Sequence, residues 1–350
     1  MSQRPRLFAL LSLVIGTIIT ISSSHWLIAW IGLEINCLAF LPLMAREHHP
    51  RPVEATTKYF VIQTTAAGTL LFATLLNAWL SGEWEIQQMT HPVPSAIITT
   101  ALIMKIGLAP AHYWLPEVLQ GLSLTMGLVL STWQKVAPMA LLIQLPHQYN
   151  YVLLIAVGAL SAFIGGWGGL NQTQLRKVLA YSSIANFGWM MMVLPFSDSI
   201  CLLSFIIYVI VTSTAFLSFK FFASTDVCSL AISWAKSPAL AAIIPLVLLS
   251  IGGLPPLTGF AVKWMILAEL TKNGLAAIAV IAALSALLAL YFYLRLAHVM
   301  TLTMAANSFM GPSPWRTKSW EWPLSVTITT VLTIALIPVT PMAFALSILL

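Results

Sequence analysis

The sequence predicts an all-α polytopic membrane protein. Of the 350 residues, 59% are hydrophobic and only 7% are charged, and the apolar residues form long runs. A soluble domain carries roughly 25% charged residues, and a membrane β-barrel shows short alternating segments instead of long apolar runs. The formal net charge of +6 is spread thinly along the chain. We therefore expect a lipid bilayer, and no nucleic acid, among its partners.

The apolar runs predict about eleven transmembrane helices, because a helix needs roughly 20 apolar residues to cross a bilayer. Their approximate ranges are 7–23, 25–44, 57–80, 95–116, 122–145, 150–170, 174–195, 199–222, 238–270, 275–300 and 324–348. The last internal loop, Ala305–Trp322, is the longest and most polar. We expect the first segment to be a spanning helix and not a cleaved signal, because no clear small-residue cleavage site follows it.

Charged residues in the loops and near the ends of the apolar segments sort unequally between the two membrane faces that this helix order defines. The face of the N-terminus receives Arg4, Arg6, Arg46, Arg51, Lys58, Arg176, Lys177, Lys220, Lys236, Arg295, Arg316 and Lys318. The opposite face receives Lys272 together with Glu83, Glu85 and Asp198. A lysine and arginine excess is typical of the cytoplasmic or matrix face. The N-terminus is predicted on that face and the C-terminus on the other.

No motif in the sequence predicts a metal or cofactor site. Cys37, Cys201 and Cys228 are an odd set without CxxC spacing, so we expect small buried side chains and no disulfide framework. The sequence contains no dinucleotide fingerprint, phosphate-binding loop, haem or iron–sulfur ligand set, or nucleophile triad. We therefore expect this chain to bind no cofactor.

Four ionisable residues remain inside apolar segments: Glu34, Lys105, Lys135 and Lys263. Such residues are costly in a membrane and usually mark a functional site. Burial disfavours the charged form of a lysine and a nearby carboxylate favours it, so a small rearrangement of Glu34 and Lys105 can control a proton. We predict proton transfer; the alternative is static counter-charges or side chains that reach the interface. His112 is a further candidate, either for a water-linked relay or for capping freed carbonyl groups.

A helix-breaking sequence accompanies two of the lysines. In Ile103–Val118, the residues GLAP at 107–110 follow Lys105, and GLPP at 253–256 precedes Lys263. Proline inside a helix removes a hydrogen-bond donor, and a broken backbone at membrane depth must be buried or line a wet cavity. Interrupted helices at corresponding positions of two inverted halves are typical of transporters. Chance is the alternative explanation of so short a repeat.

The chain contains the segments KIGLAPAHYWLPEVLQG, STWQKVAP, GGWGGLNQTQLRKVLAYSSIANFGW and IGGLPPLTGFAVKW. These segments resemble the subunit 2 family of mitochondrial NADH:ubiquinone oxidoreductase, respiratory complex I, in its vertebrate form, and the resemblance extends over nearly the whole chain. It implies an antiporter-like fold of two inverted five-helix repeats with one discontinuous helix in each. The expected repeats are residues 1–148 and 149–303, followed by a loop and a C-terminal helix in 304–350.

The resemblance also implies a proton-translocating subunit of NADH:ubiquinone reductase that performs no redox chemistry itself. The family's transmembrane glutamate matches Glu34, the lysine of its first broken helix matches Lys105, the next helix's lysine matches Lys135, and the lysine of its second broken helix matches Lys263. NADH, FMN, iron–sulfur clusters and ubiquinone are then expected in other subunits. The expected location is the mitochondrial inner membrane, with the N-terminus in the matrix, the C-terminus in the intermembrane space, and other membrane-arm and accessory subunits as partners.

One position departs from the family pattern, because Asn186 stands where many relatives carry histidine; it can hydrogen-bond water but cannot titrate. Two other functions stay open. A stand-alone cation/proton antiporter subunit would share the fold, and a non-pumping scaffold would use its buried charges only for packing. A quinone-binding subunit is a further alternative, for which the sequence shows no distinctive headgroup site.

Overall fold

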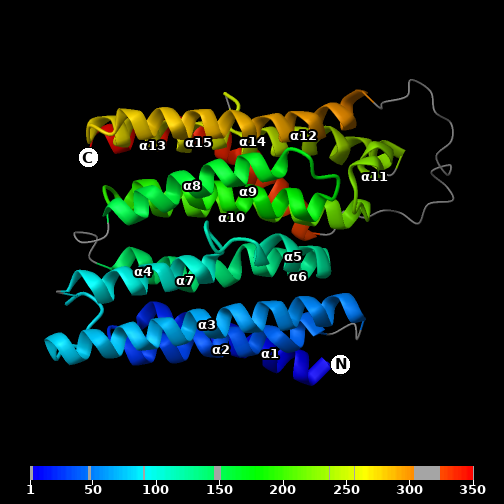
Figure 1. Ribbon diagram of the computed structural model, residues 1–350. Coiled ribbons are helices and arrows are strands. Elements are labelled where there is room, and N and C mark those ends of the chain that lie inside the picture. The colour runs from blue at the N-terminus through cyan, green and yellow to red at the C-terminus, as the bar shows by residue number, and fades with distance from the viewer. Residues whose placement is uncertain are drawn as a thin grey trace. The chain divides into compact units, whose positions relative to one another are not determined.

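The computed structural model describes residues 3–45, 49–89, 91–145, 151–235, 237–255, 257–302 and 324–349. All regular elements in these ranges are helices (Figure 1), which confirms the predicted all-α class. They are α1 (Gln3–Ser22), α2 (Trp26–Met44), α3 (Pro50–Ser81), α4 (Pro92–Ile106), α5 (Trp114–Gly121), α6 (Leu124–Ser131), η2 (Trp133–Lys135), α7 (Val136–Gln144), α8 (Tyr151–Gly169), α9 (Leu175–Val193), α10 (Asp198–Phe222), α11 (Val227–Ala231), η4 (Ile232–Ala235), α12 (Pro238–Gly252), α13 (Thr258–Lys272), α14 (Ala276–Leu302) and α15 (Leu324–Leu349).

Seven helices within the described ranges are long and apolar enough to cross a membrane. The predicted total of about eleven spans stays a prediction. Two predicted segments, 95–116 and 238–270, consist of two helices each, α4 with α5 and α12 with α13. The segment 122–145 is also interrupted, because the 3₁₀ turn η2 separates α6 from α7. The predicted polar loop Ala305–Trp322 lies outside the described residues.

The chain forms two compact units. Unit 1 comprises Met1–Ser161 and Leu194–Asp198, and unit 2 comprises Ala162–Val193 and Ser199–Leu350. The predicted repeats 1–148 and 149–303 stay a prediction. Of the three cysteines, Cys37 and Cys201 are buried as expected, whereas Cys228 is exposed. The expectation was wrong there because Cys228 belongs to the five-residue helix α11 and not to a membrane-spanning segment.

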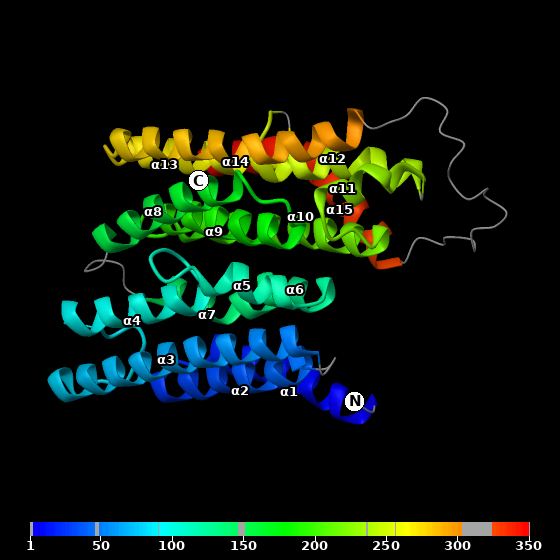
Figure 2. The same cartoon turned by 45° about the vertical axis from the view of Figure 1, so that its right-hand side comes forward.

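In unit 1, the helices α1, α2 and α3 run side by side (Figures 1 and 2). Histidines begin two of them: His25 Nδ1 accepts from the Leu27 amide at 3.2 Å, and His49 Nδ1 accepts from the Arg51 amide at 3.4 Å. Such caps satisfy amide groups that the first helical turn leaves without partners. A Cβ on Gly121 of α5 would lie 3.0 Å from the Arg51 carbonyl oxygen of α3, so these two helices pack with almost no side chain between them.

In unit 2, four glycines of α8 create close contacts with two other helices. A Cβ on Gly165 would lie 2.5 Å from the Ala185 amide nitrogen of α9, and one on Gly168 would meet the ring of Tyr181. The other two glycines, Gly166 and Gly169, face α14. A Cβ on Gly166 would lie 2.9 Å from the Ser285 carbonyl oxygen, and one on Gly169 would meet Phe292. Small residues of this kind let membrane helices approach backbone to backbone.

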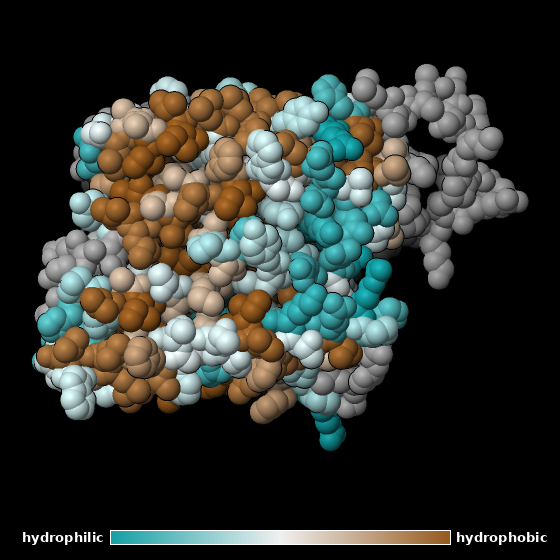
Figure 3. Space-filling view, in the orientation of Figure 1, coloured by the Kyte–Doolittle hydropathy of each residue, from teal (hydrophilic) through white to brown (hydrophobic). Residues whose placement is uncertain are grey.

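The outer surface of the helices is largely apolar. Hydrophobic side chains cover much of the face seen in Figure 3. On α1, Leu7 and Phe8 are 62% and 75% exposed, and on α14, Leu284 and Leu287 are 59% and 62% exposed. Water would leave such large apolar patches unstable, whereas lipid solvates them. The surface therefore agrees with the membrane class predicted from composition.

The contact between α8 and α9 predicts that Gly165→Ala destabilises the protein. The added Cβ would lie 2.5 Å from a backbone nitrogen and 2.8 Å from the Cα of Ala185, so the helices must separate. Overpacking of this kind costs about 1–3 kcal/mol. Thermal unfolding of the detergent-solubilised protein would measure the loss as a lowered midpoint temperature.

Gly68→Ala in α3 is the matched control, because a Cβ at Gly68 meets nothing within 4 Å. Alanine also favours a helix interior over glycine by about 1 kcal/mol, so this variant should unfold at the same or a higher temperature. Equal midpoints for the two variants would show that the α8–α9 contact does not constrain residue size.

Candidate functional site

The helices α4 and α12 end in the same backbone motif, which explains why both predicted breaks are real. Gly107 has φ 84° and ψ 44°, and Gly253 has φ 87° and ψ 43°. The Gly107 amide donates to the Ile103 carbonyl and the Gly253 amide to the Leu249 carbonyl, both at 3.0 Å. In each case the following amide donates to the same carbonyl at 3.2 Å. Glycine alone adopts this left-handed conformation without steric cost, so each helix stops at the glycine.

Lys105 lies in the last turn of α4, two residues before the break, and is only 6% exposed. Its carbonyl oxygen accepts a hydrogen bond from Gln63 Nε2 of α3 at 3.2 Å. The carbonyl groups at a helix C-terminus carry partial negative charge, which favours a cation nearby. Lys105 is therefore buried beside the end of the helix, and its role as a site residue stays a prediction.

Lys105 and Lys135 line the same cavity in unit 1. Lys135 ends the 3₁₀ turn η2 and is 2% exposed. The cavity holds about 230 Å³ of empty volume, and its other lining residues are Tyr59, Gln63, Trp114, Leu130 and Gln134. Polar groups dominate this lining, so the space suits water better than a hydrocarbon chain. Two lysines that are 30 positions apart in the sequence thus share one polar compartment.

A second cavity of about 230 Å³ also borders Lys105 in unit 1. Its lining brings in α2 and α7 through Leu33, Asn36, Cys37, Ala137 and Pro138, together with Tyr59, Gln63 and Gln134. Cys37 of α2 and Tyr59 of α3 face this cavity from two neighbouring helices. Lys105 therefore lies between two compartments, one that it shares with Lys135 and one that extends toward α2.

Glu34 lies on α2, one helical turn before Cys37, and is half-buried. Its carboxylate interacts electrostatically with the Lys105 ammonium group and with Cys37. Ion pairs within 4.0 Å join Lys58 to Glu54 and to Glu117, and Lys272 to Glu269; Glu34 belongs to none of these three. The structure therefore places Glu34 within electrostatic range of Lys105 without a direct ion pair.

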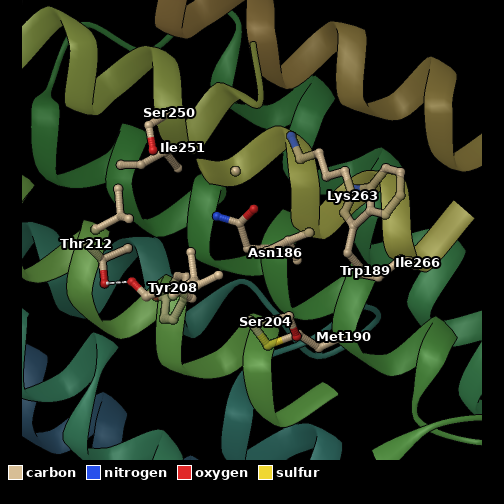
Figure 4. A pocket seen from close by; sticks show the side chains of 14 residues that line it. Asn186, Trp189, Met190, Ser204, Tyr208, Thr212, Ser250, Ile251, Lys263 and Ile266 are labelled. Atoms are coloured by element: carbon tan, nitrogen blue, oxygen red, sulfur yellow. Dashed lines mark hydrogen bonds between the residues drawn. The ribbon is translucent and has the colours of Figure 1, made fainter. Parts of the chain in front are cut away.

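Lys263 of α13 lies at the second break but uses its side chain differently. Its Nζ donates to the Gly252 carbonyl at the end of α12, at 2.7 Å, and lies 5.9 Å from the ring centre of Trp189. Figure 4 shows the lysine beside this indole. A Cβ on Gly253 would lie only 2.9 Å from the same Nζ. Lys263 of α13 therefore caps the end of α12, the helix before the break. Lys105, in contrast, lies within the last turn of α4 itself.

Lys263 also lines a cavity within unit 2 that holds about 470 Å³ of empty volume. Met190, Ile207, Val211, Ile251, Val262 and Ile266 give it a mainly apolar wall, and Asn186, Ser204, Tyr208, Thr212 and Ser250 add polar groups. Thr212 Oγ1 donates to the Tyr208 carbonyl at 2.6 Å, as drawn in Figure 4. The hydroxyl groups of Ser250 and Thr258 lie 2.9 Å apart and join α12 to α13 across the break.

His112 follows the first break and is 3% exposed. Its Nδ1 lies 3.1 Å from the Pro110 carbonyl oxygen, and its ring centre lies 4.1 Å from that of Tyr113. The Nδ1–H tautomer donates to this carbonyl. Of the two alternatives that the sequence left open, this geometry matches the capping of a freed carbonyl group; a role in a relay stays a prediction.

Sequence reasoning missed three polar residues that surround Lys105: Tyr59, Gln63 and Gln134. Tyr59 and Gln63 are four positions apart on α3, and therefore share one helix face. Both are buried, at 2% and 5% exposure. A glutamine within the apolar stretch after Lys58, and another directly before Lys135, were signals that could have identified them. None of the three was predicted from charge, because the glutamine amides and the tyrosine phenol are neutral.

Across the ranges that the structure describes, no group of three or more His, Cys, Asp and Glu residues is arranged to hold a metal ion.

Comparisons with known proteins identify the family. The transmembrane family NADH:quinone oxidoreductase/Mrp antiporter matches residues 23–289, and the family NADH dehydrogenase subunit 2 C-terminus matches residues 290–344. NADH-ubiquinone oxidoreductase chain 2 of Tetraodon nigroviridis is 61% identical over 332 residues, which cover 95% of each chain. The same-named protein of Salmo salar is 58% identical over 330 residues, covering 94% of this chain and 95% of the relative.

Solved structures agree with this result. A chain of respiratory complex I from Thermus thermophilus with bound Aureothin matches with a TM-score of 0.84 and 26% identity, covering 96% of this chain and 78% of that chain. A chain of the Mrp complex from Dietzia sp. DQ12-45-1b, at 16% identity and a TM-score of 0.80, shows the shared fold alone and covers 97% of this chain and 75% of its own length. The chain therefore belongs to the NADH:quinone oxidoreductase/Mrp antiporter family, among the NADH-ubiquinone oxidoreductase chain 2 proteins.

Proposed function

We infer that this chain is a proton-translocating membrane-arm subunit of NADH:ubiquinone oxidoreductase, respiratory complex I. Relatives with identities of 61% and 58% carry the name NADH-ubiquinone oxidoreductase chain 2, which favours this function over that of a stand-alone cation/proton antiporter. The observation that carries the proposal is the cavity shared by Lys105 and Lys135 beside a broken helix. Buried ionisable groups in a membrane segment, arranged around a polar space, suit proton transfer.

The proposed relay uses the four ionisable residues inside the apolar segments: Glu34, Lys105, Lys135 and Lys263. A proton reaches Lys105 from the face of the N-terminus, passes to Lys135 through their common cavity, and leaves by Lys263 toward the opposite face. The shared lining of Lys105 and Lys135 supports the first transfer. The second transfer rests on the position of Lys263 at the other break, in unit 2. His112 serves first as a cap on the Pro110 carbonyl, and is the side candidate for this relay.

Glu34 would control whether Lys105 holds its proton. Its carboxylate attracts the Lys105 ammonium without a direct ion pair. At an effective dielectric constant of 20, the attraction between two unit charges is about 4 kcal/mol at 4 Å and under about 2 kcal/mol at 10 Å. A movement of a few ångströms between α2 and α4 would therefore change this attraction enough to determine whether Lys105 binds or releases its proton. Redox events elsewhere in the complex would drive this movement.

The remaining parts of the proposal concern location and partners. We propose the mitochondrial inner membrane, with the N-terminus in the matrix and the C-terminus in the intermembrane space, because basic residues gather on the face of the N-terminus. The two inverted repeats would be residues 1–148 and 149–303. NADH, FMN, the iron–sulfur clusters and ubiquinone would bind to other subunits, and the partners would be other membrane-arm and accessory subunits together with lipid.

Lys105→Met tests the relay at its centre. Methionine keeps an unbranched side chain but cannot carry a proton, so protons pumped per NADH should fall, or coupled turnover should fall by about tenfold or more. Reconstituted complexes provide the measurement, with assembly checked on native gels. The control is Lys272→Met, since that lysine is 67% exposed and pairs only with Glu269 among the residues described. Full pumping by the Lys105 variant would contradict the relay.

Lys135→Met separates proton transfer from a scaffold role. If Lys135 carries protons, the variant complex should assemble but translocate fewer protons per NADH oxidised. A scaffold would give the opposite pattern, with less assembled complex and normal pumping by each complex that forms. Quantitative native gels combined with pumping measurements per assembled complex distinguish the two.

Lys263→Arg separates the capping role of Lys263 from proton release. Arginine stays charged in proteins, so it can still donate to the Gly252 carbonyl and stabilise the end of α12. We expect normal assembly with coupled turnover reduced by about tenfold or more. Lys263→Met, which loses both roles, should also assemble poorly. Normal pumping by the arginine variant would show that Lys263 need not release a proton.

A further inference from the structure

Lys105 has three companions that border both of its cavities: Tyr59, Gln63 and Gln134. Lys135 borders only the first of these cavities, and Cys37 only the second. The three companions therefore stand at the division between the space that leads to Lys135 and the space that leads toward α2. In the relay proposed above, a proton that moves between the two cavities would pass this division.

The two glutamines are held by backbone carbonyl groups. Gln63 Nε2 donates to the carbonyl of Lys105 at 3.2 Å, and Gln134 Nε2 donates to the carbonyl of Asn36 at 3.5 Å. Within the part of the chain that is described, no group donates to the Oε1 atom of either amide. Neither Oε1 is among the fully buried atoms that lack a partner. Each oxygen is therefore an acceptor that water in the cavity can reach.

We propose that Gln63 and Gln134 are positioning residues, which orient the water molecules that join Lys105 to its two cavities. This inference rests on the proposed proton-translocating function. An amide both donates and accepts hydrogen bonds. Because Nε2 is tied to a carbonyl, the direction of Oε1 is fixed, and water that donates to Oε1 can turn its lone pairs toward the Lys105 ammonium. The amide itself carries no proton.

The choice of an amide has a physical reason. A carboxylate at either position would attract the nearby lysine and hold its proton. An apolar side chain would leave water with too few partners, since a buried water needs two to four. An amide satisfies the water without adding charge, so the proton's position is left to the lysines and Glu34.

Gln63→Met and Gln134→Met test the proposal in the assembled complex. Methionine is unbranched and fills a similar space, so the helices should remain packed. Coupled turnover should fall about tenfold, the effect of losing one good hydrogen bond at the rate-limiting transfer. The KM values for NADH and quinone should stay unchanged, and the solvent deuterium isotope effect on turnover should rise, because proton transfer becomes slower than the redox steps.

Gln144→Met is the matched control. Gln144 also donates from Nε2 to the backbone carbonyl of another helix, to Ile21 at 3.1 Å, but it lines neither cavity. It should show normal turnover and a normal isotope effect. A loss of assembly in the Gln63 and Gln134 variants, with normal turnover per complex and a normal isotope effect, would overturn the proposal in favour of a packing role. Normal behaviour in every assay would overturn it as well.

Lys105→Met distinguishes the failure of this inference from the failure of the proposed function. If that variant loses pumping while both glutamine variants behave normally, the relay stands and only the role of the amides is wrong. If Lys105→Met pumps normally, the proton-translocating function itself is wrong, whatever the glutamine variants do.

Discussion

A helix that ends inside a membrane protein leaves carbonyl groups that lipid cannot satisfy, and the candidate site depends on how these groups find partners. At both breaks a glycine turns the chain so that its own amide and the next one bond back to the helix. The remaining carbonyl groups accept hydrogen bonds from side chains. Lys263 donates to the carbonyl of Gly252, Gln63 to that of Lys105, and His112 to that of Pro110. Each of these side chains thus uses one hydrogen-bonding atom to satisfy a backbone carbonyl group. The remaining polar atoms of Lys263 and Gln63 can face the cavities that these residues line.

The two breaks share a backbone but differ in what the lysine does. Lys263 comes after its break and uses one N–H on the helix end before it. Lys105 comes before its break and has two cavities beside it. A lysine whose ammonium group is bonded to a carbonyl would suit the last position of the proposed relay, from which a proton is released. A lysine between two polar spaces suits an exchange position. In the proposed relay, this asymmetry would favour transfer from Lys105 toward Lys263.

Much of this arrangement was predictable from sequence, because charge in an apolar segment is rare. Lys105, Lys135 and Glu34 were isolated that way, and the glycine–proline breaks were visible as helix-stopping residues. Three features were not predicted. The 3₁₀ turn Trp133–Lys135 contains no proline or glycine, and its one sequence signal is Pro138, which has no amide to bond the Gln134 carbonyl four residues before it. Gln63 and Gln134 are neutral, so charge sorting passed over them. The bond from Lys263 to Gly252 depends on how α13 folds back against α12, and spacing does not show that.

The glycine contacts of α8 have a mechanical consequence for the second site. Gly165 and Gly168 leave α8 and α9 touching through backbone and ring atoms, without a flexible side chain between them that could adjust to a displacement. The contact between α8 and α9 is therefore rigid, so a displacement of either helix would displace the other. Asn186 and Trp189, which α9 contributes to the Lys263 cavity, form its fixed wall. A change in the volume of that cavity would then depend mainly on α10, α12 and α13, which supply the rest of its lining.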